Sequence, residues 1–145
     1  MRANPGGRLI YFAGSIRGGR DDSHIYMQII EKLARFGRVC TEHVGSPNLS
    51  SSGEESSARG IHDRDLDWLK SADCVVAEVT TPSLGVGYEI ARATDWKKPV
   101  LCLFRPGNDK RLSAMIAGCP GVSVREYASV AETDEILQDF FEKIL

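Results

Sequence analysis

The stretch "DCVVAEVTTPSLGVGYEIARA", residues 73–93, decides the fold. Its first eight residues form an apolar run, which predicts a strand that is covered on both faces, as in a parallel sheet. A turn containing glycine and serine follows, and it leads into a helix that we expect to begin near Glu89 and to end near Trp96. The stretch is therefore one strand–turn–helix unit of an α/β protein.

The same alternation continues on both sides of this unit. The expected strands are 8–14, 38–44, 98–106 and a weaker 122–129, and the expected helices are 22–36, 61–72, a short turn at 111–119, and 132–145. Strands alternating with helices predict a doubly wound parallel sheet of five strands flanked by helices, a Rossmann-like α/β fold. We expect residues 1–7 to form a flexible tail and 8–145 a single domain, with a serine-rich loop at 45–60.

Composition narrows the classes of function. The chain has 145 residues, a net charge of −2 and no apolar run near the length of a membrane span, so we expect neither nucleic acid nor a membrane as partner. The four cysteines lie far apart and no pair has the spacing of zinc ligands. We therefore expect reduced, mostly buried thiols in an intracellular protein of the cytoplasm or nucleus, with no metal and no cofactor.

Glycines and polar residues gather where the predicted strands end, which is where open α/β sheets bind ligands. The segment "GSIRGGR" (Gly14, Ser15, Ile16, Arg17, Gly18, Gly19, Arg20) follows the first strand. Its exposed N–H groups and two arginines suit a phosphate, although it matches neither the dinucleotide fingerprint nor the Walker A loop. The alternative is a glycine-rich turn with solvated arginines.

Glu89 has two interpretations. An acid in the first turn of a helix commonly caps that helix, but here Ser83, Gly85 and Gly87 precede it and would let a ligand approach the backbone. Tyr11, near the end of the first strand, has a hydroxyl that could orient a carboxylate, although a buried tyrosine bonded to backbone is the commoner case. Two carboxylates in one cleft would indicate glycosidic chemistry.

Each of the other candidate site residues could instead have a purely structural or solvent-exposed role. Asp65 competes with Asp63 and Asp67 on the predicted 61–72 helix, and all three could form a solvated face. His43 ends the second strand, where a lone histidine is more often structural than catalytic. Ser113, in "RLSAM", could simply cap the turn that follows it.

Taken together, several motifs resemble a known family. The segments "YFAGSIRGGR", "TEHV", "IHDRDLDWL", "ADCVVAEVTTPSLGVGYEIARA", "KPVLCLFRP" and "RLSAMI" look like those of the 2′-deoxynucleoside 5′-phosphate N-hydrolases, within the nucleoside 2-deoxyribosyltransferase-like superfamily. The likeness covers nearly the whole chain, whereas the serine-rich loop at 45–60 departs from the family pattern.

The resemblance implies hydrolysis of a deoxynucleoside 5′-monophosphate to free base and 2-deoxyribose 5-phosphate. It implies Glu89 as nucleophile, Asp65 as acid and Tyr11 as the residue that positions Glu89. The implied binding residues are Gly14 to Arg20, His43 facing the base, Ser83, Gly85, and Ser113 with Ala114 and Met115, where Ser113 is contributed across a homodimer interface. A deoxyribosyltransferase, a CMP-type ribonucleotide hydrolase and a non-catalytic nucleotide-binding module are the alternatives.

Overall fold

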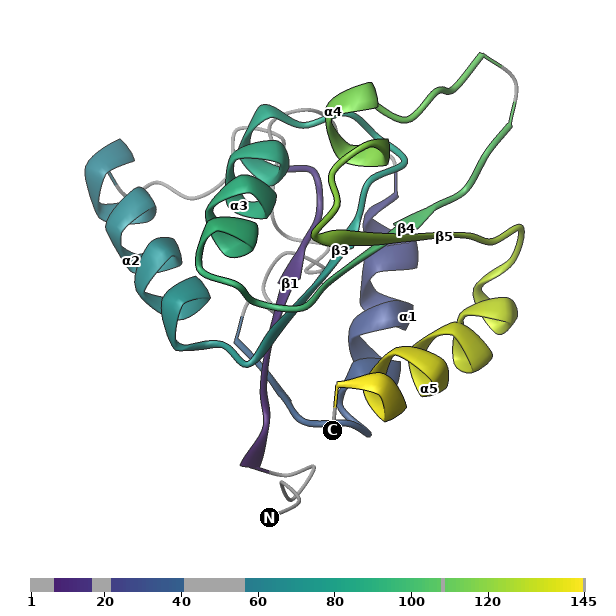
Figure 1. The fold of residues 1–145 in the computed structure, drawn as a ribbon, viewed down its shortest axis with the longest axis horizontal. Coiled ribbons are helices and arrows are strands. Elements are labelled where there is room, and N and C mark those ends of the chain that lie inside the picture. The colour runs from purple at the N-terminus through teal and green to yellow at the C-terminus, as the bar shows by residue number, and fades with distance from the viewer. Residues whose placement is uncertain (1–6, 17–21, 41–56, 108, 145) are drawn as a thin grey trace.

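Five parallel strands form one sheet in the order β2-β1-β3-β4-β5 (Figure 1). The computed structural model describes residues 7–16, 22–40, 57–107 and 109–144. The strands are β1 (Leu9–Ala13), β2 (Arg38–Val39), β3 (Cys74–Glu78), β4 (Val100–Phe104) and β5 (Val122–Glu126). The predicted doubly wound parallel sheet is confirmed, and its strand order reverses between β1 and β3, the place where such folds bind ligands.

Helices cover both faces of the sheet. On one face lie α1 (Ser23–Leu33) and α5 (Thr133–Lys143), and on the other lie α2 (Ala58–Ser71) and α3 (Leu84–Asp95), as Figure 1 shows. The single turn α4 (Ala114–Ala117) lies at the top of that view, and the 3-10 helix η3 (Val130–Glu132) leads into α5. No helix in the described part of the chain is long and apolar enough to cross a membrane.

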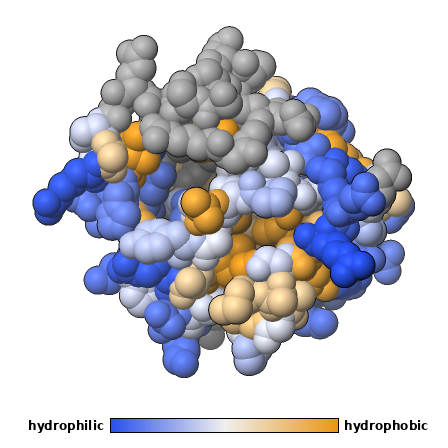
Figure 2. Space-filling model, turned by 90° about the horizontal axis from the view of Figure 1, so that it is seen from above, coloured by the Kyte–Doolittle hydropathy of each residue, from blue (hydrophilic) through white to orange (hydrophobic). Residues whose placement is uncertain are grey.

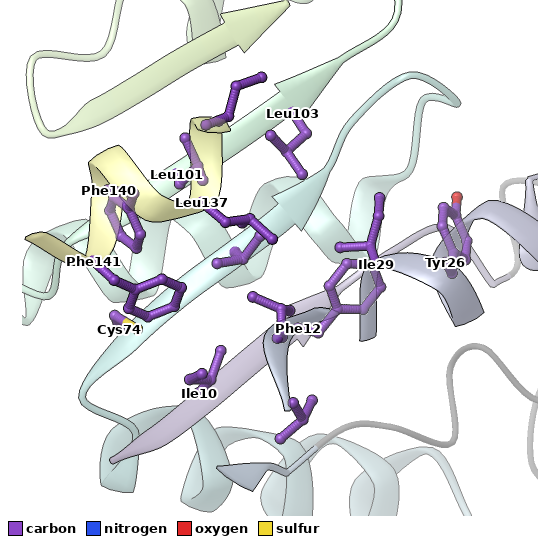
Figure 3. Close-up of a cluster of buried hydrophobic side chains, with 14 of the residues drawn as sticks. Ile10, Phe12, Tyr26, Ile29, Cys74, Leu101, Leu103, Leu137, Phe140 and Phe141 are labelled. Carbon is purple, nitrogen blue, oxygen red and sulfur yellow. The ribbon is translucent and has the colours of Figure 1, made fainter. Parts of the chain in front are cut away.

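Each face of the sheet carries its own apolar core because successive side chains of a strand point to opposite faces. Ile10 and Phe12 of β1 pack toward α1 and α5, in the cluster drawn in Figure 3. Tyr11 and Ala13 pack toward α2 and α3. The alternation therefore sends Tyr11 to the face that carries the helix of Glu89.

Several boundaries differ from those expected. Helix α2 begins at Ala58 because the Ser57 hydroxyl accepts a hydrogen bond from the Gly60 N–H (3.0 Å), so the helix includes the end of the expected 45–60 loop. The rest of that loop lies outside the described residues, as do residues 1–6 of the expected tail and most of the expected 38–44 strand. All four cysteines are free, with Cys74 and Cys102 buried and the other two partly so.

Candidate active site

Strands β1, β3 and β4 end toward the top of Figure 1, where α3 begins and the turn α4 lies. Figure 2 looks down on this edge and shows hydrophobic and hydrophilic side chains mixed on it. The segments after β1 and after β3 are neighbours here because the two strands pair directly. The candidate site is therefore built where the strand order reverses.

Helix α3 begins earlier than the sequence predicts. Its N-cap is Ser83, whose hydroxyl accepts a hydrogen bond from the Val86 N–H (3.2 Å), so the helix starts at Leu84. The expectation that Glu89 heads this helix is wrong, since Glu89 lies in the second turn. A serine can accept the first free N–H groups, and a cap made by Glu89 is therefore excluded.

The two glycines of this helix face open space. A methyl group added at Gly87 would meet no other atom within 4 Å, and one at Gly85 would meet only the Ser83 hydroxyl oxygen, at 3.8 Å. Glycine lowers helix stability, so two of them in the first turns of α3 oppose the local propensity. Packing among the described residues does not require glycine at either position. Close approach of a ligand to the backbone would require it.

Tyr11 and Glu89 meet across the sheet–helix interface. The Tyr11 hydroxyl, at the buried end of a side chain that is 1% exposed, donates a hydrogen bond to a carboxylate oxygen of Glu89. Burial raises the pKa of Tyr11, and the negative charges of Glu89 and Asp65 raise it further. Tyr11 therefore stays protonated and acts as a permanent donor to the Glu89 carboxylate.

The surroundings of Glu89 shift its own ionisation. Burial raises the pKa of Glu89 to about 7, the hydrogen bond from Tyr11 acts in the opposite direction, and the charge of Asp65 raises the pKa again. A carboxyl group with such a pKa is shared between its neutral and ionised forms near neutrality, which is frequent at catalytic positions.

Asp65 is the acid of α2 that lies nearest this pair in electrostatic terms. Its charge raises the pKa of both Tyr11 and Glu89. Arg64 holds the Asp65 carboxylate through Nε (3.1 Å) and Nη2 (2.9 Å) and stacks on the ring of Trp68, 4.8 Å from its centroid. The neighbouring acids Asp63 and Asp67 are exposed, so the structure separates Asp65 from the solvated face.

The start of the expected phosphate-binding segment rests against α1. The Tyr26 hydroxyl accepts a hydrogen bond from the Ser15 N–H (3.0 Å), and a methyl group added at Gly14 would lie 2.9 Å from the Tyr26 ring. Ile16 packs partly buried against the core of the α1 face. Gly14 is thus required for close approach of the ring, and Tyr26, which the sequence did not single out, fixes the direction in which the segment leaves the sheet.

The remaining expected residues fall in two groups. Arg17, Gly18, Gly19, Arg20 and His43 lie outside the described residues. Ser113 is exposed and caps α4, since its hydroxyl accepts a hydrogen bond from the Met115 N–H (3.2 Å), and Ala114 and Met115 are exposed beside it. Within one chain, no hydrogen bond of this turn to another described residue reaches Glu89. Among the described residues, no cluster of His, Cys, Asp and Glu could hold a metal ion.

A second buried carboxylate, not expected from the sequence, lies on the opposite face of the sheet. Glu78 ends β3, is fully buried, and accepts hydrogen bonds from the Thr80 N–H and Thr80 hydroxyl (2.8 Å each) and from the Tyr127 hydroxyl. Burial raises the pKa of Glu78, against the lowering effect of these hydrogen bonds. The available signal was an acid inside the apolar run "CVVAEV", where both faces of the strand are covered.

An arginine connects this carboxylate to α1. Arg105, just after β4, pairs with Asp22 (Nη2–Oδ1, 2.8 Å) and lies 3.7 Å from Glu78. Its Nη1 donates to the Tyr127 hydroxyl (3.3 Å), and its backbone N–H donates to the Thr80 hydroxyl (2.9 Å). We call Asp22, Glu78, Thr80, Arg105 and Tyr127 the edge network.

Comparison with curated proteins finds relatives that are at least half identical to this chain. Two curated relatives are both named 5-hydroxymethyl-dUMP N-hydrolase. The protein of Tetraodon nigroviridis is 55% identical over 137 residues, covering 91% of this chain and 96% of that protein. The human protein is 50% identical over 146 residues, covering 97% and 83%.

Solved structures show the same fold at low identity. The CMP N-glycosidase of Clostridium botulinum superposes with a TM-score of 0.63 at 18% identity, covering 90% of this chain and 99% of that one. A molybdenum cofactor carrier protein from Chlamydomonas reinhardtii gives 0.55 at 16% identity, covering 94% and 99%. Because a glycosidase and a carrier protein share this fold, the fold does not identify the function, and sequence similarity is needed to identify the family. The model described as nucleoside 2-deoxyribosyltransferase matches residues 10–127, and this chain belongs to that family.

Proposed function

We propose that the protein hydrolyses the N-glycosidic bond of 2′-deoxynucleoside 5′-monophosphates, giving free base and 2-deoxyribose 5-phosphate. The observation that carries the proposal is the hydrogen bond from Tyr11 to Glu89, at a half-buried carboxylate with Asp65 nearby and open glycines before it. The names of the curated relatives make 5-hydroxymethyl-dUMP the first substrate to test.

In the first step, a Glu89 carboxylate oxygen forms a bond to C1′ of the sugar. The C1′–N bond breaks, its electron pair leaves with the base, and Asp65, as the proposed general acid, gives the base a proton. Charge at C1′ builds up in an oxocarbenium-like transition state, which the Glu89 carboxylate stabilises. Tyr11 keeps the attacking group in position throughout, because it remains protonated.

In the second step, water attacks C1′ and the Glu89 oxygen departs with its bonding electrons. Asp65, now ionised, accepts the proton of the water and returns to its starting state. Two displacements at the same carbon give net retention of configuration, and this class of mechanism places the two carboxyl groups roughly 5 Å apart.

Glu89→Ala is expected to abolish base release while leaving nucleotide binding largely intact, because the variant loses the attacking atom and keeps the binding segments. Chromatography of free base from 5-hydroxymethyl-dUMP and the four common deoxynucleoside monophosphates measures this, with CMP and deoxyguanosine as comparison substrates. Asp67→Ala, which removes an exposed acid of α2, is the matched control and should keep wild-type activity. Near-wild-type turnover by Glu89→Ala would refute the mechanism.

Transfer of the sugar to a second base is the competing activity, and the family to which the chain belongs favours testing it. The same experiment with an added free base separates the two activities. A new nucleotide as main product would identify a transferase, whereas 2-deoxyribose 5-phosphate as main product supports the hydrolase. Binding of the nucleotides without release of base would identify a non-catalytic module.

The proposed active form is a homodimer in which Ser113 of one subunit contacts the substrate phosphate of the other. Support comes from exposed apolar side chains at the same edge of the molecule, Leu84 (96% exposed) and Met115 (82%). Contiguous exposed apolar surface commonly marks an interface, and these two side chains would form part of one in the proposed dimer. Ser113 is also exposed and so is free to meet a second subunit.

A further inference from the structure

The edge network joins segments that are distant in the sequence and that flank the proposed phosphate site. Asp22 is the N-cap residue of α1, and its backbone carbonyl accepts hydrogen bonds from the Ile25 and Tyr26 N–H groups (2.9 and 3.0 Å). Its side chain accepts from Arg105 on one oxygen and from the Thr81 hydroxyl (3.3 Å) on the other. Asp22 thus ties the start of α1 to the end of β4 and to the turn that precedes α3.

Arg105 holds the other side of the same junction. Its backbone N–H binds the Thr80 hydroxyl, and that hydroxyl donates to Glu78. The guanidinium reaches Asp22 with one nitrogen and the Tyr127 hydroxyl with the other. One arginine therefore contacts the turn before α3, the start of α1 and the end of β5.

The charges of the network explain why an arginine is needed there. Asp22 and Glu78 are 6% and 0% exposed, so two carboxyl groups lie buried at the edge where the proposed substrate carries its phosphate. Buried charges without a partner are costly, and two acids beside an anion would repel it. Arg105 pairs with both acids and so compensates their negative charge. Its planar guanidinium group can bind several partners at once.

We infer that Arg105 is a positioning residue: with Asp22 it holds the turn before α3 against the start of α1, and so sets the distance between Ser83 and Ser15, which α1 holds through Tyr26. The inference rests on the proposed function and on the resemblance to the family, which implies Ser15 and Ser83 among the residues that bind the substrate. Arg105 does not touch the substrate in this account; it acts through Thr80, Thr81 and Asp22.

The test compares Arg105→Met with Arg125→Met. Arg125 lies on the neighbouring strand β5 and forms an ion pair with Asp139 (3.4 Å), in which both side chains are 41% exposed, so it is a matched loss of an arginine outside the network. NMR titration with 2-deoxyribose 5-phosphate measures binding without turnover. We expect Arg105→Met to weaken this binding about tenfold or more and Arg125→Met to leave it within about twofold of wild type.

A purely structural role would give a different pattern. Loss of stability alone lowers the melting temperature but leaves the affinity of the folded fraction unchanged, so unchanged affinity in folded Arg105→Met overturns the inference. If Arg105→Met does not fold, Arg105→Lys decides, because a lysine keeps the charge but cannot reach Asp22 and Tyr127 together. We expect binding about threefold weaker in Arg105→Lys, and wild-type affinity there overturns the inference.

The two proposals fail separately. Base release from 5-hydroxymethyl-dUMP by the wild type tests the proposed function and needs no titration. In an active wild type, kcat should change little in Arg105→Met while KM for the monophosphate rises, because Glu89 and Asp65 lie on the other face of the sheet. A fall confined to kcat would overturn the positioning role and leave the hydrolase in place. An inactive wild type whose sugar phosphate binding still depends on Arg105 would refute the hydrolase alone.

Discussion

Glu89 is subject to two opposing influences. Burial raises its pKa to about 7, and the Tyr11 hydroxyl favours its ionised form. A fully solvated glutamate would be ionised but strongly hydrated, and a buried one without a donor would be neutral. The pair therefore holds an attacking group that is partly ionised near neutrality and largely shielded from water, and a nucleophile toward C1′ requires both properties.

Tyr11→Phe should shift the pH dependence of the reaction. Glu89 attacks only when ionised, so the wild-type kcat/KM rises with pH up to about 7. Above that pH the ionisation of Glu89 no longer limits the rate. Without the hydroxyl the pKa of Glu89 rises by about one to two units, the equivalent of one hydrogen bond to a charged group. The acid limb then moves to higher pH, and activity falls more at pH 6 than at pH 8.5.

A pH–rate profile of both proteins on the same substrate measures the shift. Because both proteins are measured on the same substrate, the titration of the substrate phosphate affects both profiles equally and does not contribute to the difference between them. An acid limb at the same pH in Tyr11→Phe would contradict the assigned role of the hydroxyl.

At the scale of elements, Ser83 has two duties that can be separated. It caps α3, and by its place at the glycine-bearing start of that helix it is a proposed phosphate ligand. Ser57 is the N-cap of α2 with the same kind of hydrogen bond, to Gly60, and has no proposed contact with substrate. The two serines are a matched pair for telling capping from binding.

Ser83→Ala and Ser57→Ala should each lower the free energy of unfolding by about 1 kcal/mol, the usual loss for an N-cap. Only Ser83→Ala should also raise KM for the monophosphate, by about tenfold or more, since a hydrogen bond to a charged group is lost. Chemical denaturation and initial rates measure the two effects. Equal KM values for the two variants would remove Ser83 from the binding site.

Most elements could be predicted because their signals are local. The apolar run of β3 and the amphipathic face of α5 each lie within one stretch of chain, and Ile136, Leu137 and Phe141 of α5 are buried in the core. The predicted start of α3 was wrong because Gly85 and Gly87 favour a turn by propensity. The Ser83 cap and the burial of one face of the helix make these residues helical instead. Tertiary packing outweighs propensity at such positions.

At the scale of the molecule, strand order separates two carboxylates. Glu89 lies on the α2–α3 face and Glu78 on the α1–α5 face of one sheet, both at its carboxyl edge. The edge network could not be predicted because Asp22, Glu78, Arg105 and Tyr127 come together only after the order of β1, β3, β4 and β5 is known. The catalytic roles of Glu89, Asp65 and Tyr11 came from the resemblance to a family, because the spacing of these residues in the sequence did not indicate them.

A shared active site predicts complementation between two inactive variants. Ser113→Ala subunits keep Glu89 but lose the proposed phosphate contact, and Glu89→Ala subunits keep Ser113 but lose the nucleophile. Mixed dimers contain one site with both groups intact, so an equal mixture should recover about a quarter of wild-type activity at low substrate concentration. Rates before and after mixing, with sedimentation to confirm exchange of subunits, measure this. No recovery after exchange would place Ser113 outside the partner's site.

The alternation along β1 has a consequence for how the chain finds its register during folding. Both faces of this strand are buried in apolar cores, so the hydrophobic pattern alone hardly distinguishes the native pairing from a slip by one residue, which would exchange Tyr11 with Phe12. The Tyr11 hydroxyl does distinguish them, because in the slipped strand it would be buried without the Glu89 carboxylate. The pair proposed to break the glycosidic bond thus also penalises the misaligned strand, and a chain that lacks either group loses a check on its own folding.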